Sequence, residues 1–117
     1  MADQFTRITD AEMRALVEAG ASGREIIAYL QLMRYEGDPE HPTRHWVSAS
    51  AASRRTGMSW DAVRQALARL TRRRFTVAGG ATLPVLTRVE RACRNKSAVY
   101  NNNVQAAMNA GQLPPPF

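Results

Sequence analysis

The sequence has 117 residues, of which 44% are hydrophobic, and this size allows one domain with a single modest core. Its formal net charge is +6 and it contains one cysteine, which excludes an internal disulfide. No apolar run approaches the length that a bilayer crossing needs and the first residues lack a signal-peptide core, so we expect a cytoplasmic protein.

The charge is distributed unevenly along the chain. Residues 1–40 contain four arginines and eight acidic residues, a net charge of −4. Residues 41–117 contain eleven arginines and one lysine against two acidic residues, a net charge of +10. A basic segment of this kind is typical of a surface that faces polyphosphate, so we expect the second part of the chain to carry the binding surface.

Two helices are predicted in the first part of the chain. The capping-box pattern Thr9-Asp-Ala-Glu12 predicts a helix over residues 10–18, which Gly20 ends. A second capping box at residues 22–25 predicts another helix that closes near residues 36–37. We expect its apolar stripe to pack across the helices that follow, and the stripe consists of Ile26, Ile27, Leu30 and Met33.

A loop and a strand are predicted next. Residues 36–43 contain glycine, two prolines and several polar residues without periodicity, which indicates a surface loop. His45-Trp46-Val47 carries residues that favour β-structure, so we predict a short strand there.

Residues 48–73 predict a helix-turn-helix. Ser48 is a cap candidate for a first helix over residues 49–55, and Gly57 can adopt the positive φ that a tight reversal requires. Ser59 is the cap candidate for a second helix that begins at Trp60. An apolar stripe identifies the face of this helix that lies on the core, and it consists of Val63, Ala66, Leu67 and Leu70.

β-Structure is predicted again after Arg74. Phe75-Thr-Val77 is strand-like, Gly79-Gly80 predicts a turn, and Pro84 excludes a central strand at that point. Residues 85–91 and 98–101 are two strand candidates, and residues 92–97 join them as the basic tip of a hairpin.

The last segment, residues 105–117, is predicted to be a C-terminal tail. It could begin with a helical turn over residues 105–108, but Gly111 and Pro114-Pro-Pro116 favour extended chain. Leu113 and Phe117 are candidates for docking on a partner subunit.

A family resemblance rests on the spacing of seven residues in the helix-turn-helix. The segment resembles the helix-turn-helix of bacterial winged-helix DNA-binding proteins, above all the plasmid- and phage-type regulators. The resemblance implies a mainly α fold with a small β-hairpin, in which residues 1–104 form one winged helix-turn-helix domain. Residues 85–104 would form the wing, and residues 105–117 the tail. The seven residues are Ser53, Gly57, Met58, Ser59, Val63, Ala66 and Leu70.

In that family the exposed start of the second helix enters the major groove. Arg64 can pair with guanine and Gln65 with adenine, whereas Asp61 can accept from cytosine or orient Arg64. For Asp61 a solvated helix face explains the residue equally well, and for Trp60 we favour packing under the turn over contact with a thymine methyl. The expected base-contacting set is Ser59, Trp60, Asp61, Arg64 and Gln65.

A second group of residues is expected to contact phosphates, which positions a protein on DNA without recognising the sequence. Arginines at helix C-termini can also stabilise the helix dipole, and both roles are compatible. The phosphate set is Ser48, Ser50, Arg54, Arg55, Arg69, Arg72 and Arg73, with Arg74 beside it. The expected wing contacts are Arg91, Arg94, Asn95 and Lys96.

No catalytic or metal-binding pattern stands out. His41 and His45 with Cys93 could be combined into a metal site, but the spacing matches no metal motif, so we expect neither metal nor cofactor. The chain has no nucleophile elbow and no phosphate-binding glycine loop, so we expect no enzyme.

These observations together predict a sequence-specific double-stranded DNA-binding protein located at the nucleoid. The expected role is a transcriptional repressor of plasmid, phage or mobile-element type, acting as a homodimer. One alternative is a replication-initiator or excisionase-like architectural protein. The other is a winged helix that binds protein, such as a phage inhibitor of a host system. The sequence does not specify whether a small effector binds.

Overall fold

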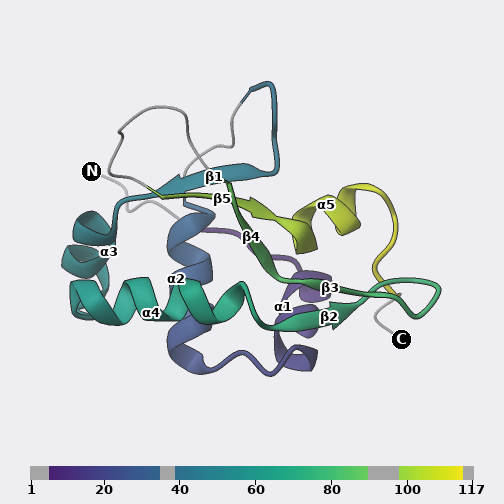
Figure 1. Ribbon diagram of the computed structural model, residues 1–117, viewed down its shortest axis with the longest axis horizontal. Coiled ribbons are helices and arrows are strands. Elements are labelled where there is room, and N and C mark those ends of the chain that lie inside the picture. The colour runs from purple at the N-terminus through teal and green to yellow at the C-terminus, as the bar shows by residue number, and fades with distance from the viewer. Residues whose placement is uncertain (1–5, 35–38, 90–97, 115–117) are drawn as a thin grey trace.

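The chain folds into helices packed on two small antiparallel sheets (Figure 1). The structure is a computed structural model and describes residues 6–34, 39–89 and 98–114. Within these ranges the elements are α1 (Asp10–Glu18), α2 (Gly23–Leu32), β1 (Arg44–Val47), α3 (Ala49–Thr56), α4 (Trp60–Leu70), β2 (Arg74–Thr76), β3 (Thr82–Pro84), β4 (Leu86–Val89), β5 (Ala98–Asn102) and α5 (Asn103–Asn109).

Helix α1 has the predicted boundaries because both of its ends are set by local hydrogen bonding. The Glu12 backbone N–H donates to the Thr9 hydroxyl at 3.1 Å, and the Thr9 backbone N–H donates to the Glu12 carboxyl at 3.2 Å. The chain leaves the helix through Gly20, whose φ is +80°. The predicted capping box and the terminating glycine are therefore both confirmed.

Helix α2 begins where predicted, but a different face of it is buried. Ser22 caps the helix, whereas Ile27, which we expected in the apolar stripe, is 40% exposed. The buried residues are Ala28, Tyr29 and Leu32, together with Glu25. Ile26 and Met33 of the predicted stripe pack against the core and are partly buried, so the prediction is correct in part. The buried face is shifted because Tyr29 and Glu25 are buried with polar partners elsewhere in the fold, and apolar periodicity does not identify such residues.

The helix-turn-helix is confirmed in each of its local features. The Ser48 hydroxyl accepts from the Ala51 N–H, and the Ser59 hydroxyl accepts from the Ala62 N–H, so both helices begin at the predicted caps. Gly57 has a φ of +75° and ends α3. The predicted stripe of α4 is buried and consists of Val63, Ala66, Leu67 and Leu70.

Strands β1, β5 and β4 form a three-stranded antiparallel sheet in that order. The predicted strand at residues 45–47 is β1, and the predicted hairpin strands are β4 and β5, which pair antiparallel. Strand β5 therefore lies between an element that precedes α3 and one that follows α4. The predicted hairpin tip, residues 92–97, lies outside the described residues.

The strand predicted near Phe75 is β2, which pairs with β3 in a separate two-stranded hairpin, and this pairing was not predicted. Gly79 and Gly80, with φ of +97° and +91°, make the expected turn between them. Pro84 ends β3 and is tolerated there because a two-stranded hairpin leaves half of its backbone groups unpaired. The hairpin is inserted between α4 and β4.

The helical turn considered for residues 105–108 lies within α5, which runs over Asn103–Asn109, so this part of the expected tail is helical. The Asn102 side chain caps α5, and Val104 and Ala107 are buried. Leu113 packs against the same core, so it contacts its own chain. The start of the helix was placed too late because the asparagines at residues 101–103 resemble a strand end, although Asn102 is an effective helix cap.

One core unites these elements into a single α+β domain. Buried side chains from α1, α2, α4, both sheets and α5 belong to one continuous cluster. Among the described residues, no helix combines the length and the apolar content that crossing a membrane requires.

Candidate nucleic-acid interface

The first two turns of α4 present the predicted base-contacting residues to solvent. Trp60 is 48% exposed, and Asp61, Arg64 and Gln65 are also exposed. Ser59 is exposed as well, although its hydroxyl already caps the helix. The opposite side of the helix lies on the core, so these residues share the outer surface of α4.

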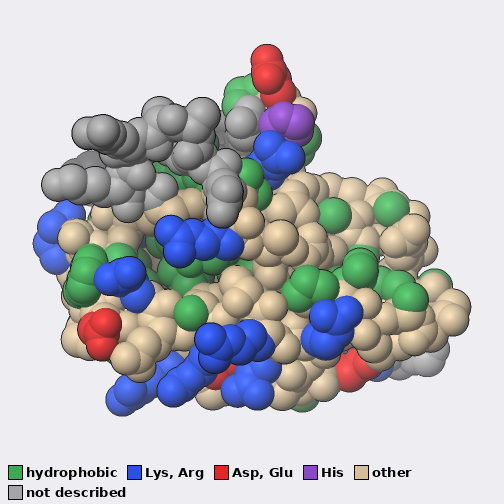
Figure 2. All heavy atoms as spheres, in the orientation of Figure 1, with side chains coloured by type: hydrophobic (Ala, Val, Ile, Leu, Met, Phe, Trp, Pro, Cys, Tyr) green, Lys and Arg blue, Asp and Glu red, His purple; other side chains and the backbone are tan. Residues whose placement is uncertain are grey.

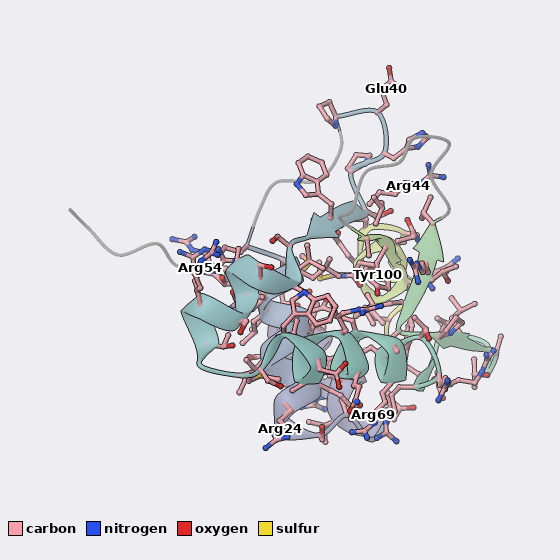
Figure 3. The ribbon with its side chains drawn as sticks, turned by 60° about the vertical axis from the view of Figure 1, so that its left-hand side comes forward. Arg24, Glu40, Arg44, Arg54, Arg69 and Tyr100 are labelled. Carbon is pink, nitrogen blue, oxygen red and sulfur yellow. The ribbon has the colours of Figure 1, made fainter. Side chains whose placement is uncertain are left out.

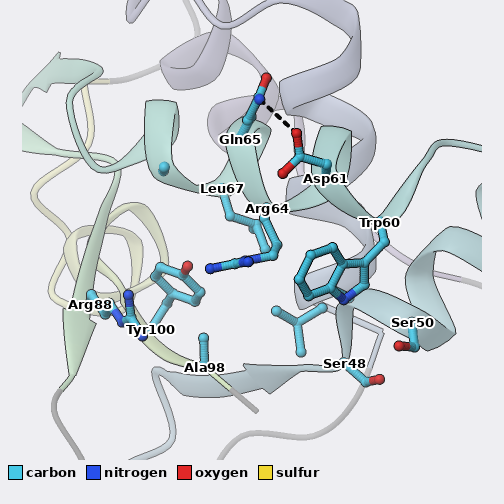
Figure 4. Close-up of a pocket in the computed structure, with 13 residues that line it drawn as sticks. Ser48, Ser50, Trp60, Asp61, Arg64, Gln65, Leu67, Arg88, Ala98 and Tyr100 are labelled. Atoms are coloured by element: carbon cyan, nitrogen blue, oxygen red, sulfur yellow. Dashed lines mark hydrogen bonds between the residues drawn. The ribbon is translucent and has the colours of Figure 1, made fainter. Parts of the chain in front are cut away.

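Trp60 does not pack under the turn, which corrects the role that we favoured for it. The Arg64 guanidinium carbon lies 4.6 Å from the centre of the Trp60 ring, a cation–π arrangement. In Figure 4 the Arg64 guanidinium extends past the Trp60 ring toward Tyr100. Trp60 therefore holds the arginine in one orientation at the surface.

Asp61 is paired with Gln65 and not with Arg64. The Gln65 side-chain amide donates to the Asp61 carboxylate at 2.9 Å (Figure 4). This i,i+4 pair lies on the exposed side of α4, where water competes with it. The expectation that Asp61 orients Arg64 is therefore wrong, and the Arg64 side chain is left without an acidic partner in the described residues.

A cleft of about 750 Å³ lies between α4, the junction of β1 with α3, and the strands β4 and β5. Trp60, Arg64 and Gln65 line its helix side, and Ser48 and Ser50 line the junction. The opposite wall comes from the sheet and contains Arg88 and Tyr100, which pair across β4 and β5 in the antiparallel register.

Sequence analysis missed Arg88 and Tyr100. That Arg88 and Tyr100 lie side by side could be inferred only from the register of the hairpin, because residues opposite each other on neighbouring strands share a face of the sheet. The connection over residues 90–97 is too long to specify one register from a turn motif. The β-favouring residues of Leu86-Thr-Arg-Val89 indicated a strand but not its partner.

Tyr100 is 6% exposed, and burial raises the pKa of its hydroxyl. The positive charges of Arg88 and Arg64 act in the opposite direction and lower the same pKa. Both guanidinium groups are therefore close enough to influence the phenol. No hydrogen bond to the Tyr100 hydroxyl occurs within the described part of the chain.

The predicted phosphate contacts differ in how free their side chains are. The side chains of Arg54, Arg69 and Arg72 are exposed and make no hydrogen bond or ion pair within residues 6–34, 39–89 and 98–114. Figure 3 shows Arg54 and Arg69 extending outward from α3 and α4. Figure 2 shows that Lys and Arg outnumber Asp and Glu on the face that α4 forms.

Other members of that set are already engaged within the fold. The Arg55 side chain donates to Gln31 of α2 at 2.8 Å, and Arg74 donates to Thr82 across the β2–β3 hairpin. Ser48 is the cap of α3, whereas its neighbour Ser50 is exposed at the cleft. These contacts favour structural roles for Arg55 and Arg74.

Arg73 is the clearest revision of the predicted phosphate set. Its guanidinium donates to both carboxylate oxygens of Glu25, at 2.8 and 3.2 Å. Glu25 is 1% exposed and also accepts from the Ser22 hydroxyl. The hydrogen bond from Arg73 is the largest cause of the lowered pKa of Glu25, and burial opposes it. Arg73 therefore neutralises a buried carboxylate, and we no longer expect it to contact phosphate.

We expect Arg73→Ala to lower the melting temperature by several degrees at pH 7, because it leaves the buried Glu25 carboxylate without its partner. The pKa of Glu25 is lowered in the folded state, so the pair stabilises above the ordinary value of 4.5 and loses its effect as pH falls through the lowered pKa. Thermal melts at pH 7 and pH 3 measure the difference, which should shrink in acid.

Arg72→Ala is the matched control, since Arg72 is the adjacent arginine and is exposed. Its melting temperature should stay close to that of the unmodified protein at both pH values. Equal melting temperatures for the two variants at pH 7 would show that the Glu25 pair adds nothing to stability.

The predicted wing contacts Arg91, Arg94, Asn95 and Lys96 lie outside the described residues. The strands that carry this segment do reach the interface, because Arg88 and Tyr100 stand opposite α4 in the cleft. In the part of the chain that the structure describes, no three His, Cys, Asp or Glu side chains gather as a metal site would require.

The candidate interface therefore combines the exposed start of α4, the exposed arginines around it and the cleft between α4 and the strands β4 and β5. Models of known protein families, curated proteins and solved structures were compared with the chain, and none of them matches it.

Proposed function

We propose that the protein is a winged helix-turn-helix protein that binds double-stranded DNA sequence-specifically and acts as a transcriptional repressor. The observation that carries the proposal is the outer surface of α4, where Trp60, Arg64 and Gln65 are exposed immediately after a glycine-mediated turn. The order β1-β5-β4, with β1 before α3 and the β4–β5 hairpin after α4, supports the winged-helix assignment.

Base recognition would require Arg64 to leave Trp60. An exposed cation–π contact contributes about 0.5–1 kcal/mol, whereas a bidentate arginine–guanine pair contributes about 1–3 kcal/mol. The exchange is therefore favourable when a guanine is present and unfavourable when the arginine would meet no acceptor. The Asp61–Gln65 pair is exposed, so Gln65 can exchange it for an adenine at small cost.

Affinity that does not depend on sequence would come from the exposed arginines around α4. Arg54 lies in α3 and Arg69 in the last turn of α4, and Arg72 follows the end of α4. Their guanidinium groups have no partner among the described residues, so contact with phosphate costs no existing ion pair. Ser50 and the wing residues would extend the same contact surface.

A repressor of this size would act by occupying its operator, and we propose that two copies bind together. In helix-turn-helix dimers the recognition helices enter successive major grooves about 34–36 Å apart. The proposed role in plasmids, phages or mobile elements rests on the resemblance of the helix-turn-helix to those regulators.

We expect Arg64→Ala to weaken binding to a selected operator about tenfold while changing affinity for random duplex much less. The operator is first obtained by selecting bound sequences from a random duplex library. Fluorescence anisotropy with operator and random duplex then gives the ratio of the two affinities for each variant. The ratio of operator affinity to random-duplex affinity should fall in Arg64→Ala because the variant lacks one base contact.

Arg69→Ala is the matched comparison, because it removes an exposed arginine from the same helix. It should weaken both duplexes alike and leave the ratio unchanged. If Arg64→Ala also weakened both duplexes equally, Arg64 would be a phosphate contact and a different face of α4 would recognise bases.

A further inference from the structure

The cleft beside α4 brings three hydrogen-bond donors to one place. Arg64 approaches from the helix, while Arg88 and Tyr100 approach from neighbouring strands of the sheet (Figure 4). None of the three side chains makes a hydrogen bond or ion pair within residues 6–34, 39–89 and 98–114. The charges of both arginines act on the Tyr100 hydroxyl, which indicates that the three groups lie close to one another.

The electrostatics of the cleft favour an anion that carries more than one charge. Among the described residues that line it, Asp61 is the one acidic residue, and its carboxylate already accepts from Gln65. Two guanidinium groups therefore face the cleft against one engaged carboxylate. A phosphate monoester carries about −1.5 to −2 charges at pH 7 and offers three acceptor oxygens, which matches two guanidinium groups and a phenol hydroxyl.

The aromatic lining favours a ligand that also has a flat ring. The Trp60 ring is about half exposed, and the Tyr100 ring forms part of the opposite wall. The cleft volume of about 750 Å³ is within the range of about 300–1,000 Å³ that small-molecule sites occupy. Rings and phosphate donors are thus combined in a space that fits one nucleotide.

We propose that this cleft binds a free nucleotide. Its phosphate is held by Arg64, Arg88 and the Tyr100 hydroxyl, and its base lies against the Trp60 ring. The ligand class is a planar heteroaromatic ring that carries a phosphate monoester. Ser48 and Ser50 at the edge of the cleft offer hydroxyl groups toward the sugar.

A regulatory consequence follows, and it rests on the proposed function. Arg64 cannot bind a nucleotide phosphate in the cleft and a guanine in the major groove at the same time. Nucleotide binding therefore lowers affinity for the operator, and operator binding lowers affinity for the nucleotide by the same factor. The protein would release its operator when the nucleotide concentration rises.

The first experiment uses no DNA, so its result does not depend on the proposed function. Isothermal titration calorimetry of the full chain in low-salt buffer without phosphate compares adenosine 5′-monophosphate, adenosine and inorganic phosphate. The expected result is one site for the monophosphate, with both fragments binding much more weakly. Absence of binding at millimolar monophosphate, or equal binding of adenosine, would overturn the proposal.

Variants then test which residues hold the ligand. Arg88→Ala and Tyr100→Phe should each weaken binding of the monophosphate, Arg88→Ala by about tenfold or more because it removes a charge-assisted hydrogen bond. Arg24→Ala is the matched control, since Arg24 is exposed on α2 and does not line the cleft. An equal loss in Arg24→Ala would indicate attraction to the overall positive charge and would overturn the site.

The second experiment adds the monophosphate to the operator complex and follows anisotropy. We expect the operator dissociation constant of the unmodified protein to rise as the monophosphate is added. In Arg88→Ala this rise should be absent. If the monophosphate binds in calorimetry but leaves the operator dissociation constant unchanged, nucleotide and operator do not compete. That result would overturn the competition and leave the nucleotide site supported. Failure to bind any duplex would remove the proposed function and leave the calorimetric result intact.

Discussion

Affinity for duplex DNA is expected to fall about 250- to 1,000-fold between about 50 and 200 mM salt. Each arginine that neutralises a phosphate releases counterions, which gives a logarithmic slope of about −0.9 per contact. Contact by five arginines therefore corresponds to a slope of about −4 to −5. Four of these contacts are expected from the exposed arginines Arg54, Arg69, Arg72 and Arg88, and the fifth is expected from one of the proposed wing residues.

The slope is measured by anisotropy titrations of random duplex at a series of salt concentrations. The double variant Arg54→Ala/Arg69→Ala should have a slope shallower by about 2, whereas Arg73→Ala should keep the original slope wherever it remains folded, because Arg73 is occupied by Glu25. No duplex binding at about 50 mM salt would sink the DNA hypothesis. The basic surface would then favour the alternative of a module that binds an acidic protein.

The features that sequence analysis predicted correctly depend on short-range interactions. Thr9, Ser48 and Ser59 cap helices through hydrogen bonds that span three residues, and Gly57 supplies a conformation that few other residues adopt. Such signals can be recognised in a short segment of the sequence because all the residues involved are close together in the chain. The boundaries of α1, α3 and the start of α4 could therefore be predicted without knowing the fold.

The features that it missed depend on distant partners. The burial of Glu25 depends on Arg73, which lies 48 residues later, and the burial of Tyr29 depends on Asn102. A polar residue is assigned to the surface unless its partner is known, so the buried face of α2 was placed in the wrong phase. Arg88 and Tyr100 were missed for the same reason, since their proximity requires the strand register.

The charge asymmetry of the sequence is also weaker at the surface than the residue counts suggest. Glu12 and Glu25, two of the eight acidic residues before residue 41, are buried, and Glu25 is neutralised by a basic residue of the second part of the chain. The net charge of a segment therefore indicates a binding surface only when the acidic and basic residues of buried ion pairs are left out of the count. Arg54 of α3 and Arg64 and Arg69 of α4 remain exposed after that correction.

Replacing Tyr29 by phenylalanine is expected to lower the free energy of unfolding by about 1.5–3 kcal/mol. The Tyr29 hydroxyl donates to Glu12 at 2.6 Å and accepts from the Asn102 side chain at 2.9 Å, so it joins α1, α2 and the end of β5. Phenylalanine keeps the ring and leaves a buried acceptor and a buried donor without this partner. Urea denaturation measures the change.

Tyr100→Phe is the matched control for this prediction. It makes the same chemical change, but the Tyr100 hydroxyl has no hydrogen bond in the described residues, so the loss should be below about 0.5 kcal/mol. Equal losses would show that the Glu12–Tyr29–Asn102 network contributes nothing beyond packing of the ring.

Alkaline pH gives an independent measure of the same network. Burial is the main cause that raises the pKa of Tyr29, with a further contribution from Glu12. The pKa of Tyr29 in the folded protein lies above the ordinary value of 10.0. The protonated Tyr29 hydroxyl therefore stabilises the fold fully below pH 10, and this stabilisation is lost as the pH rises above 10. The unfolding free energy should therefore decline above pH 10, and less steeply in Tyr29→Phe. The same slope in both proteins would mean that Tyr29 ionises as readily in the folded protein as in the unfolded chain.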